Sequence, residues 1–264
     1  MTYTALVLAG SRGPRCDVAA LGPVSHKAIL PINGTPMIER VVATLRAVKA
    51  INKVVVVIET PDILHNLPGL APLLADGYLD TLTAKPSPAQ SALHGFDAAG
   101  AGQDGPVLMT TADNCLITPE ILEFFLSSLR DDADVTAAIA KTDTVMKAYP
   151  EARRTRMRFR DGGVGGCNLF AFQTANARRI ITFWRQIEEN RKNPLTMLRQ
   201  LGALTALRYV TNTLTLTQAL HKLGKRTGTR LKTTDMPFAE AAIDVDTADD
   251  FHLAEKILMQ RNDG

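Results

Sequence analysis

A group of small and cationic residues near the N-terminus is the first part of the sequence that could do chemistry. An apolar run at 5–9 (ALVLA) is followed by Gly10, Ser11, Arg12, Gly13, Pro14 and Arg15, and Lys27 comes in the next polar turn. Small residues let the backbone approach a ligand closely, and arginines pair with phosphate oxygens. This order indicates an anion-binding loop. A plain surface loop is the alternative, because the glycines match neither GxGxxG nor GxxxxGK[ST].

Carboxylates follow apolar runs at two other places. Asp113 comes directly after the run at 106–111 (PVLMTT), and Asp244 and Asp246 lie in the run at 242–246 (AIDVD). Side chains alternate along a strand, so a strand at 242–246 would present both aspartates on one face. Magnesium prefers carboxylate oxygens, so these residues are candidate metal ligands. A cap on the turn toward Thr118 is the other interpretation of Asp113.

The elements that must position these residues alternate along the first half of the chain. Apolar runs predict strands at 5–9, 53–58, 78–84, 106–111 and 133–141. Helices are predicted between them at 37–49, 61–75 (interrupted by prolines), 89–99 and 119–129. This alternation predicts an α/β fold with a doubly wound, mostly parallel sheet. Ligands lie beyond the carboxyl ends of the strands in such sheets, which brings 10–15, 87–91 and Asp113 around one cleft.

The second half is less regular. The segment 152–160 carries five arginines and is either a solvated edge strand or a binding site for an anionic acceptor. A glycine turn leads into a predicted strand at 165–172. Residues 174–226 are predicted to form two or three helices, which would be a packed helical subdomain, a dimer contact or, less favoured, a membrane-surface face. Thr247 is a predicted N-cap for a final helix at 248–260, with Asp250 completing a capping box.

Composition limits the classes of protein further. We expect a single domain over 1–264, with a nucleotide-binding half (1–141) and an acceptor-binding half (142–264) that contains the helical insertion at about 174–226. A net charge of +3 is too small to indicate nucleic-acid binding. The three cysteines are far apart, so neither a disulfide framework nor a zinc site is expected. No signal segment and no apolar run of about 20 residues is visible, so we expect a cytoplasmic protein without a transmembrane segment.

Two stretches resemble a known superfamily. Residues 5–41 contain the order Leu-Ala-Gly-x-x-Gly-x-Arg, then Lys27, then Leu-Pro-Ile-x-Gly-x-Pro-Met-Ile. This order resembles the signature of GT-A-type nucleotidyltransferases, which include MobA-like NTP transferases, IspD-like cytidylyltransferases and sugar-1-phosphate nucleotidyltransferases. The run Asp-Val-Asp-Thr-x-Asp-Asp at 244–250 is similar to the Asp-Ile-Asp-Thr-Pro-Glu-Asp end of MobA-like proteins. The resemblance implies a Rossmann-like GT-A fold.

The resemblance also implies an activity: transfer of NMP from an NTP to a small phosphorylated acceptor, with Mg²⁺ as cofactor and pyrophosphate as product. It implies that Arg15 and Lys27 bind the phosphates, and that Asp113 and Asp246, rather than its rival Asp244, hold the metal. The remaining expected contacts fall into two groups. Nucleotide contacts are expected from Leu8, Ala9, Gly10, Ser11, Arg12, Gly13, Ser87, Gln90 and Ser91, and acceptor contacts from Gly166 and Asn168, with Arg158 of the arginine-rich segment.

Two departures from the family pattern keep other functions open. Ser11 stands where relatives usually carry glycine, and Pro14 stands where many carry threonine or serine, so a nucleotide-binding module without turnover is one alternative. A GT-A glycosyltransferase that uses a nucleotide sugar is another, although Arg15 and Lys27 argue for a triphosphate. An NAD-dependent enzyme is disfavoured because its fingerprint is missing. Release of pyrophosphate would distinguish the first function from all of these.

Overall fold

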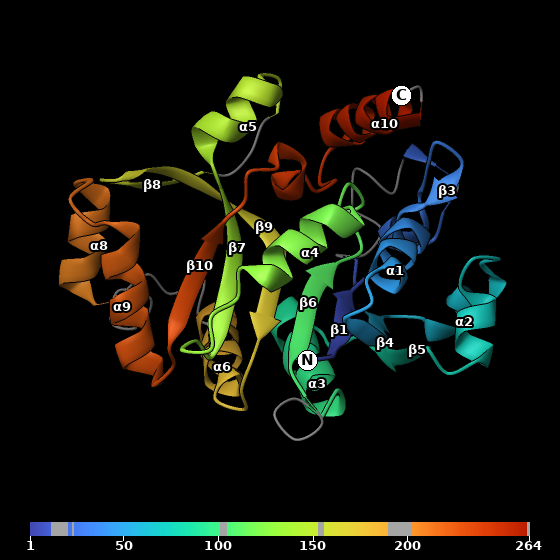
Figure 1. Ribbon diagram of the computed structural model, residues 1–264, viewed down its shortest axis with the longest axis horizontal. Coiled ribbons are helices and arrows are strands. Elements are labelled where there is room, and N and C mark those ends of the chain that lie inside the picture. Colours follow the sequence, from blue (N-terminus) through green and yellow to red (C-terminus); the bar gives the residue numbers. More distant parts are fainter. Residues whose placement is uncertain (12–20, 23, 101–104, 153–155, 190–201, 263–264) are drawn as a thin grey trace.

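The computed structural model describes residues 1–11, 21–22, 24–100, 105–152, 156–189 and 202–262, and its centre is an eight-stranded sheet (Figure 1). The strands run in the order β10-β7-β9-β6-β1-β4-β5, with β8 paired to β9. Their bounds are β1 (Tyr3–Leu8), β4 (Ile51–Ile58), β5 (Leu79–Thr83), β6 (Val107–Thr111), β7 (Val135–Lys141), β8 (Met157–Phe159), β9 (Gly162–Phe172) and β10 (Leu231–Asp235).

Most neighbouring strands are parallel. Strand β1 pairs in parallel with β4 and β6, β4 with β5, and β7 with β10. The exception is β9, which runs antiparallel to β6, β7 and β8. The expected doubly wound, mostly parallel α/β sheet is therefore confirmed.

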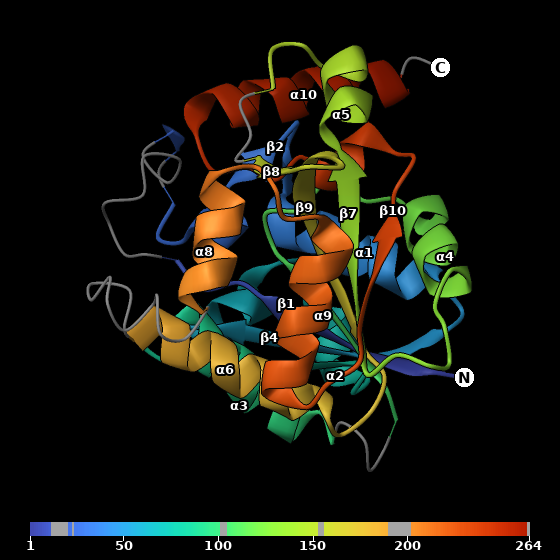
Figure 2. The same ribbon diagram turned by 90° about the vertical axis from the view of Figure 1, so that its left-hand side faces the viewer.

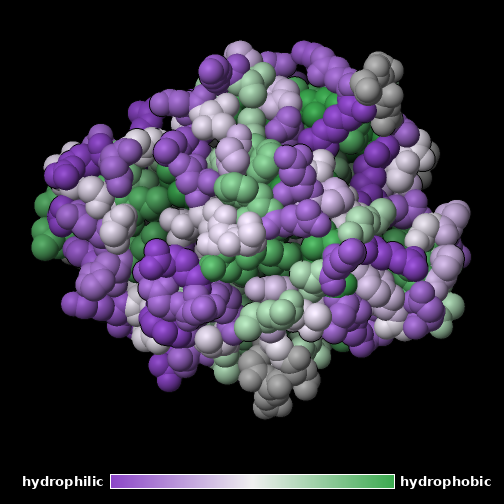
Figure 3. All heavy atoms as spheres, in the orientation of Figure 1, coloured by the Kyte–Doolittle hydropathy of each residue, from purple (hydrophilic) through white to green (hydrophobic). Residues whose placement is uncertain are grey.

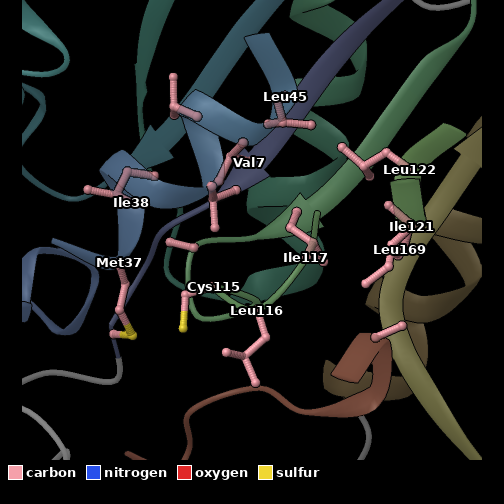
Figure 4. Packing of buried hydrophobic residues seen from close by; sticks show 14 of the residues in the cluster. Val7, Met37, Ile38, Leu45, Cys115, Leu116, Ile117, Ile121, Leu122 and Leu169 are labelled. Atoms are coloured by element: carbon pink, nitrogen blue, oxygen red, sulfur yellow. The ribbon is translucent and has the colours of Figure 1, made fainter. Parts of the chain in front are cut away.

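Helices cover both faces of the sheet because the central strands are apolar on both sides. Ala5 and Val7 of β1 belong to a cluster with buried residues of α1 (Met37–Ala47) and α4 (Pro119–Ser127). Leu6 belongs to a second cluster, with α3 (Pro88–Ala98) and α6 (Ala177–Glu189). Figure 2 shows these two pairs of helices on opposite sides of the sheet. Figure 4 shows side chains of α1, α4 and the segment after β6 pointing toward one another in the first cluster.

Several local features of the fold are set by single residues. Asn33 and Gly34 form the tight turn between β2 (Pro31–Ile32) and β3 (Thr35–Pro36), both with positive φ. The hydroxyl of Thr118 caps α4 by accepting a hydrogen bond from the Ile121 amide. The proline-interrupted stretch is broken into η3 (Pro61–Asn66) and α2 (Ala71–Ala75).

The predicted strand at 242–246 is wrong. The chain there forms a short 3₁₀ helix, η4 (Ala239–Ala242), and continues without regular structure to Thr247, where α10 (Ala248–Asn262) follows. Ile243 and Val245 are fully buried, so the alternating pattern reflects burial against the core without a strand partner. The elements that were not predicted include α5 (Thr142–Ala148) and β10, which has a single apolar residue, Leu231.

The helical region is present as α6, α8 (Ala203–Val210) and α9 (Leu216–Thr227), with 190–201 outside the described residues. Helix α8 exposes Leu204, Leu207 and Val210, and Figure 3 shows hydrophobic surface at the edge of the molecule where α8 lies in Figure 1. No helix in the described ranges combines the length and apolar character that crossing a bilayer requires.

Cys115 and Cys167 are free, and burial raises the pKa of each thiol to about 12.

Candidate functional site

Lys27 lies at the centre of the candidate site, in the 3₁₀ helix η2 (Lys27–Ile29). Its ammonium nitrogen Nζ is 2.5 Å from Oδ2 of Asp113 and 2.8 Å from Oδ1 of Asp246. Burial by itself would lower the pKa of Lys27, but the charges of Asp113 and Asp246 and their hydrogen bonds outweigh burial and raise it. The side chain is therefore a permanent cation, and it neutralises part of a carboxylate cluster.

Three aspartates form that cluster. Asp113, Asp244 and Asp246 each present a carboxylate oxygen, and these oxygens lie within 4.8 Å of one another. Asp113 comes from the end of β6, whereas the other two come from the irregular segment before α10. The expectation that Asp244 and Asp246 face the same way is confirmed, although no strand presents them. The structure brings both rivals for the second metal position to one place.

The irregular segment is held by bonds at both of its ends. The Val245 amide donates to the carbonyl oxygen of Asp113 at 3.1 Å, which ties the segment to the end of β6. On the other side, Oδ2 of Asp250 accepts bonds from the Asp246 amide at 3.2 Å and the Thr247 amide at 2.9 Å. The Asp250 amide in turn donates to the Thr247 hydroxyl at 3.3 Å, so the predicted capping box is present.

The donor set of this cluster fits a hard divalent cation. Oxygen atoms of one or two carboxylates, with phosphates and water, are the usual shell of Mg²⁺. Oδ1 of Asp113 is buried and has no hydrogen-bond partner among the described residues, which is costly for a carboxylate oxygen unless a ligand satisfies it. Asp113, Asp246 and Asp244 are the residues that could hold a metal.

Asn168 lies beside the cluster. Its side-chain amide donates to Oδ2 of Asp244 at 2.7 Å, so the structure brings this predicted acceptor residue to a carboxylate. Gly166, two residues earlier in β9, has open space where a Cβ would lie, and Arg158 is exposed on β8.

The loop after β1 forms a second group at the carboxyl ends of the strands. The Ser11 amide donates to Oε1 of Glu59 at 2.7 Å. The same oxygen lies 3.3 Å from the position that a Cβ would take on Gly10, and Ala84 is the next neighbour. The expected nucleotide loop thus meets the ends of β4 and β5. Leu8 and Ala9 lead into it, whereas Arg12, Gly13 and Arg15 lie outside the described residues.

The start of α3 carries the expected base-reading residues. Ser87 is the N-cap of α3 and accepts a bond from the Gln90 amide, while the Ser91 hydroxyl bonds to the backbone of Lys85. The Ala89 amide donates to Oε2 of Glu188, from α6, at 3.2 Å. These contacts order the helix start, and no described contact joins it to the carboxylate cluster.

Sequence reasoning missed two polar residues around the site. Glu59 directly follows the apolar strand β4, and its position at a carboxyl end was the available signal. Asn114 follows Asp113; it is buried, and its side-chain amide donates to the Cys167 carbonyl at 3.0 Å. A single asparagine in a turn gives no sequence signal of that long-range contact.

Comparisons with known proteins bear on the family and on the fold. A model of the MobA-like NTP transferase domain matches residues 5–227. By structure, the chain is similar to a hypothetical transferase from Thermus thermophilus, with 25% identity, a TM-score of 0.78, and coverage of 95% of this chain and 100% of the other. No curated protein matched by sequence.

Two further solved structures share the fold at lower identity. The 4-diphosphocytidyl-2C-methyl-D-erythritol synthase from Anaerococcus prevotii DSM 20548 is 15% identical, with a TM-score of 0.59 and coverage of 98% of this chain and 96% of the other. A CMP:2-keto-3-deoxy-manno-octonic acid synthetase complexed with CTP is 16% identical, with a TM-score of 0.59 and coverage of 99% and 100%.

Proposed function

Because this chain belongs to the MobA-like NTP transferase domain family, we propose that it transfers a nucleoside monophosphate from an NTP to a small phosphorylated acceptor. The acceptor would be a sugar phosphate, a polyol phosphate or the phosphate of a cofactor precursor. An acceptor phosphate oxygen forms a bond to the α-phosphorus, the bond from that phosphorus to the β-bridging oxygen breaks, and pyrophosphate leaves. Family membership supports nucleotidyl transfer, and the acceptor class is our proposal.

The observation that carries this proposal is the contact of Lys27 with Asp113 and Asp246 at the end of β6. Phosphoryl chemistry needs little covalent participation from the protein, and its main requirements are positioning and neutralisation of charge. The ammonium of Lys27 and a metal ion held by the carboxylates would be the two groups that neutralise the charge of the phosphates.

Each residue has a distinct role in this proposal. Asp113 and Asp246 would hold Mg²⁺, with Asp244 beside them. The bound ion would supply positive charge to the triphosphate. Lys27 would donate hydrogen bonds to phosphate oxygens, and Arg15 is proposed to do the same from the loop. Leu8 to Gly13 and the start of α3, with Ser87, Gln90 and Ser91, would bind the nucleotide.

The acceptor would lie toward β8 and β9. Arg158 offers a guanidinium to an acceptor phosphate, and the open space beside Gly166 lets an acceptor approach the backbone of β9. An arginine binds a phosphate with two parallel hydrogen bonds, which favours an anionic acceptor over a neutral one.

The test is release of pyrophosphate with Mg²⁺ and each of the four NTPs, against a panel of sugar and polyol phosphates. Release with one NTP and one acceptor would establish the reaction and identify both substrates. NTP binding without release across the panel would instead support the nucleotide-binding module. Absence of NTP binding would overturn the proposal.

A further inference from the structure

Asn168 has a backbone conformation that a strand does not normally contain. Its φ is +47°, in the left-handed region, although it lies within β9. The register between β7 and β9 changes at the same place: Ala137 pairs with Phe170, but Ile139 pairs with Gly166. Two steps along β7 therefore correspond to four along β9. The extra residues form a bulge, which is a feature that redirects a side chain away from the regular pleat.

Asn114 anchors this bulge through a hydrogen bond to its backbone. It is 1% exposed, and its side-chain amide donates to the Cys167 carbonyl at 3.0 Å and to the Thr110 hydroxyl at 3.3 Å. Its own Oδ1 is buried without a hydrogen-bond partner in the part of the chain that the structure describes. A buried amide oxygen without a hydrogen-bond partner is unfavourable. The contact of Asn114 with β9 is made in spite of this cost.

The side chain of Asn168, within the bulge, contacts the carboxylate cluster. Its amide Nδ2 lies 2.7 Å from Oδ2 of Asp244, a short distance typical of a hydrogen bond to a charged acceptor. Asp244 lies in a segment without regular structure, so the backbone around it is not fixed by a strand ladder. Asn168 lies on a strand that pairs with β6, β7 and β8, so its amide is well suited to fix the direction of the Asp244 carboxylate.

We propose that Asn168 is a positioning residue for the metal site: through its bond to Asp244 it sets the carboxylate that lies beside Asp113 and Asp246. The bulge and its anchor, Asn114, place the Asn168 amide for this purpose. This inference rests on the proposed function, and it assigns to Asn168 a role different from the acceptor contact expected from the sequence. Outer partners of metal ligands typically change metal affinity by about 10–100-fold when removed.

The left-handed backbone makes a clean test possible. Glycine adopts this conformation without strain, so Asn168→Gly removes the amide and keeps the bulge. Asn212 has a similar φ of +53° beyond α8, so Asn212→Gly is the matched control for the backbone effect. Circular dichroism would verify that each variant is folded.

The measurement is the dissociation constant of Mn²⁺, followed by electron paramagnetic resonance in the absence of substrates, together with KM for the acceptor. We expect about a 10-fold or greater weakening of Mn²⁺ binding in Asn168→Gly and none in Asn212→Gly. Equal Mn²⁺ affinity in Asn168→Gly and the unchanged chain, with a raised acceptor KM, would overturn the inference in favour of an acceptor contact. Absence of Mn²⁺ binding by the unchanged chain, both alone and in the presence of NTP, would overturn the metal assignment itself.

Discussion

Lys27 binds two of the carboxylates that would hold a metal ion, so the ammonium and the metal compete for the same oxygens. Its side chain is 12% exposed, and this burial limits how far water can replace either partner. In the proposed reaction the ammonium has a second set of acceptors, the phosphate oxygens. In that reaction the ammonium would therefore exchange its carboxylate partners for phosphate oxygens when a metal and a nucleotide bind together.

Lys27→Met tests this exchange. Removing the ammonium should lower the rate of pyrophosphate release by about 100-fold or more, because a charge-stabilising group is lost. The same change should tighten Mn²⁺ binding in the absence of nucleotide, because the carboxylates lose their internal cation. Isothermal titration with MnCl₂ measures the second effect. Unchanged or weaker Mn²⁺ binding would show that the ammonium does not compete with the metal.

Asp113→Ala should abolish metal-dependent turnover and leave the fold intact. The backbone carbonyl of Asp113, which holds Val245, is kept in this variant, so the segment before α10 retains that bond. Asp80→Ala is a suitable control, because Asp80 forms an exposed ion pair with Lys53 on the far strands. Pyrophosphate release and circular dichroism check the two halves of the prediction. Retained turnover in Asp113→Ala would contradict the metal assignment.

The ends of three elements meet at another carboxylate, Asp134, which is 1% exposed. It accepts bonds from the Arg230 backbone amide at 2.8 Å and side chain at 2.9 Å, and from the Thr174 hydroxyl at 2.7 Å. The hydrogen bonds from Arg230 lower the pKa of Asp134 well below its usual range. Asp134 thereby joins the starts of β7 and β10 to the segment that leads into α6.

A pH dependence follows from this lowered pKa. The charged form is favoured in the folded state, so its contribution to the free energy of unfolding is present above about pH 4 and is lost as the pH falls further. Asp134→Asn should lower that free energy by about 2 kcal/mol at pH 7, and the difference should shrink below about pH 4. Urea unfolding from pH 7 to pH 3 measures this. Exposed Asp132→Asn should have little effect, and an equal loss there would contradict the assignment.

The start of α10 gives a prediction that links an element to the site. Asp250→Ala removes the acceptor for two backbone amides and should lower the free energy of unfolding by about 1–2 kcal/mol, as loss of a cap does. It should also weaken metal binding, since Asp246 is one of the residues released. Thr247→Ala keeps both of those bonds to Asp250 and serves as the comparison. If the two variants bind the metal equally well, the bonds to Asp250 stabilise the start of α10 but do not contribute to metal binding.

The sequence predicted correctly those features for which a residue pattern has a single physical explanation. The parallel strands follow from continuous apolar runs, and the Thr247 cap follows from a side chain that satisfies a free amide. The segment 242–246 was misread because burial of Ile243 and Val245 against the core gives the same alternation as a strand. The bond from Asn168 to Asp244 could not be predicted, since it depends on a bulge that the register of β9 creates.

At the scale of the whole molecule, the candidate site joins distant parts of the chain. Lys27 is 86 residues from Asp113 and 219 residues from Asp246. The remaining carboxylate neighbour, Asp244, is held from β9. The N-terminal part, the middle and the C-terminal part of the chain must therefore all be in place before the cluster exists.

Contacts of such long sequence separation make the site a reporter of complete folding. An incompletely folded chain lacks one of the three contributions, so a nucleotide and a metal would bind only the native state. At a ligand concentration of 100 times its dissociation constant, such binding raises the free energy of unfolding by about 2.7 kcal/mol. Slower proteolysis with MnCl₂ and NTP would then extend to cleavage sites throughout the chain, and would not be confined to loops near the carboxylates.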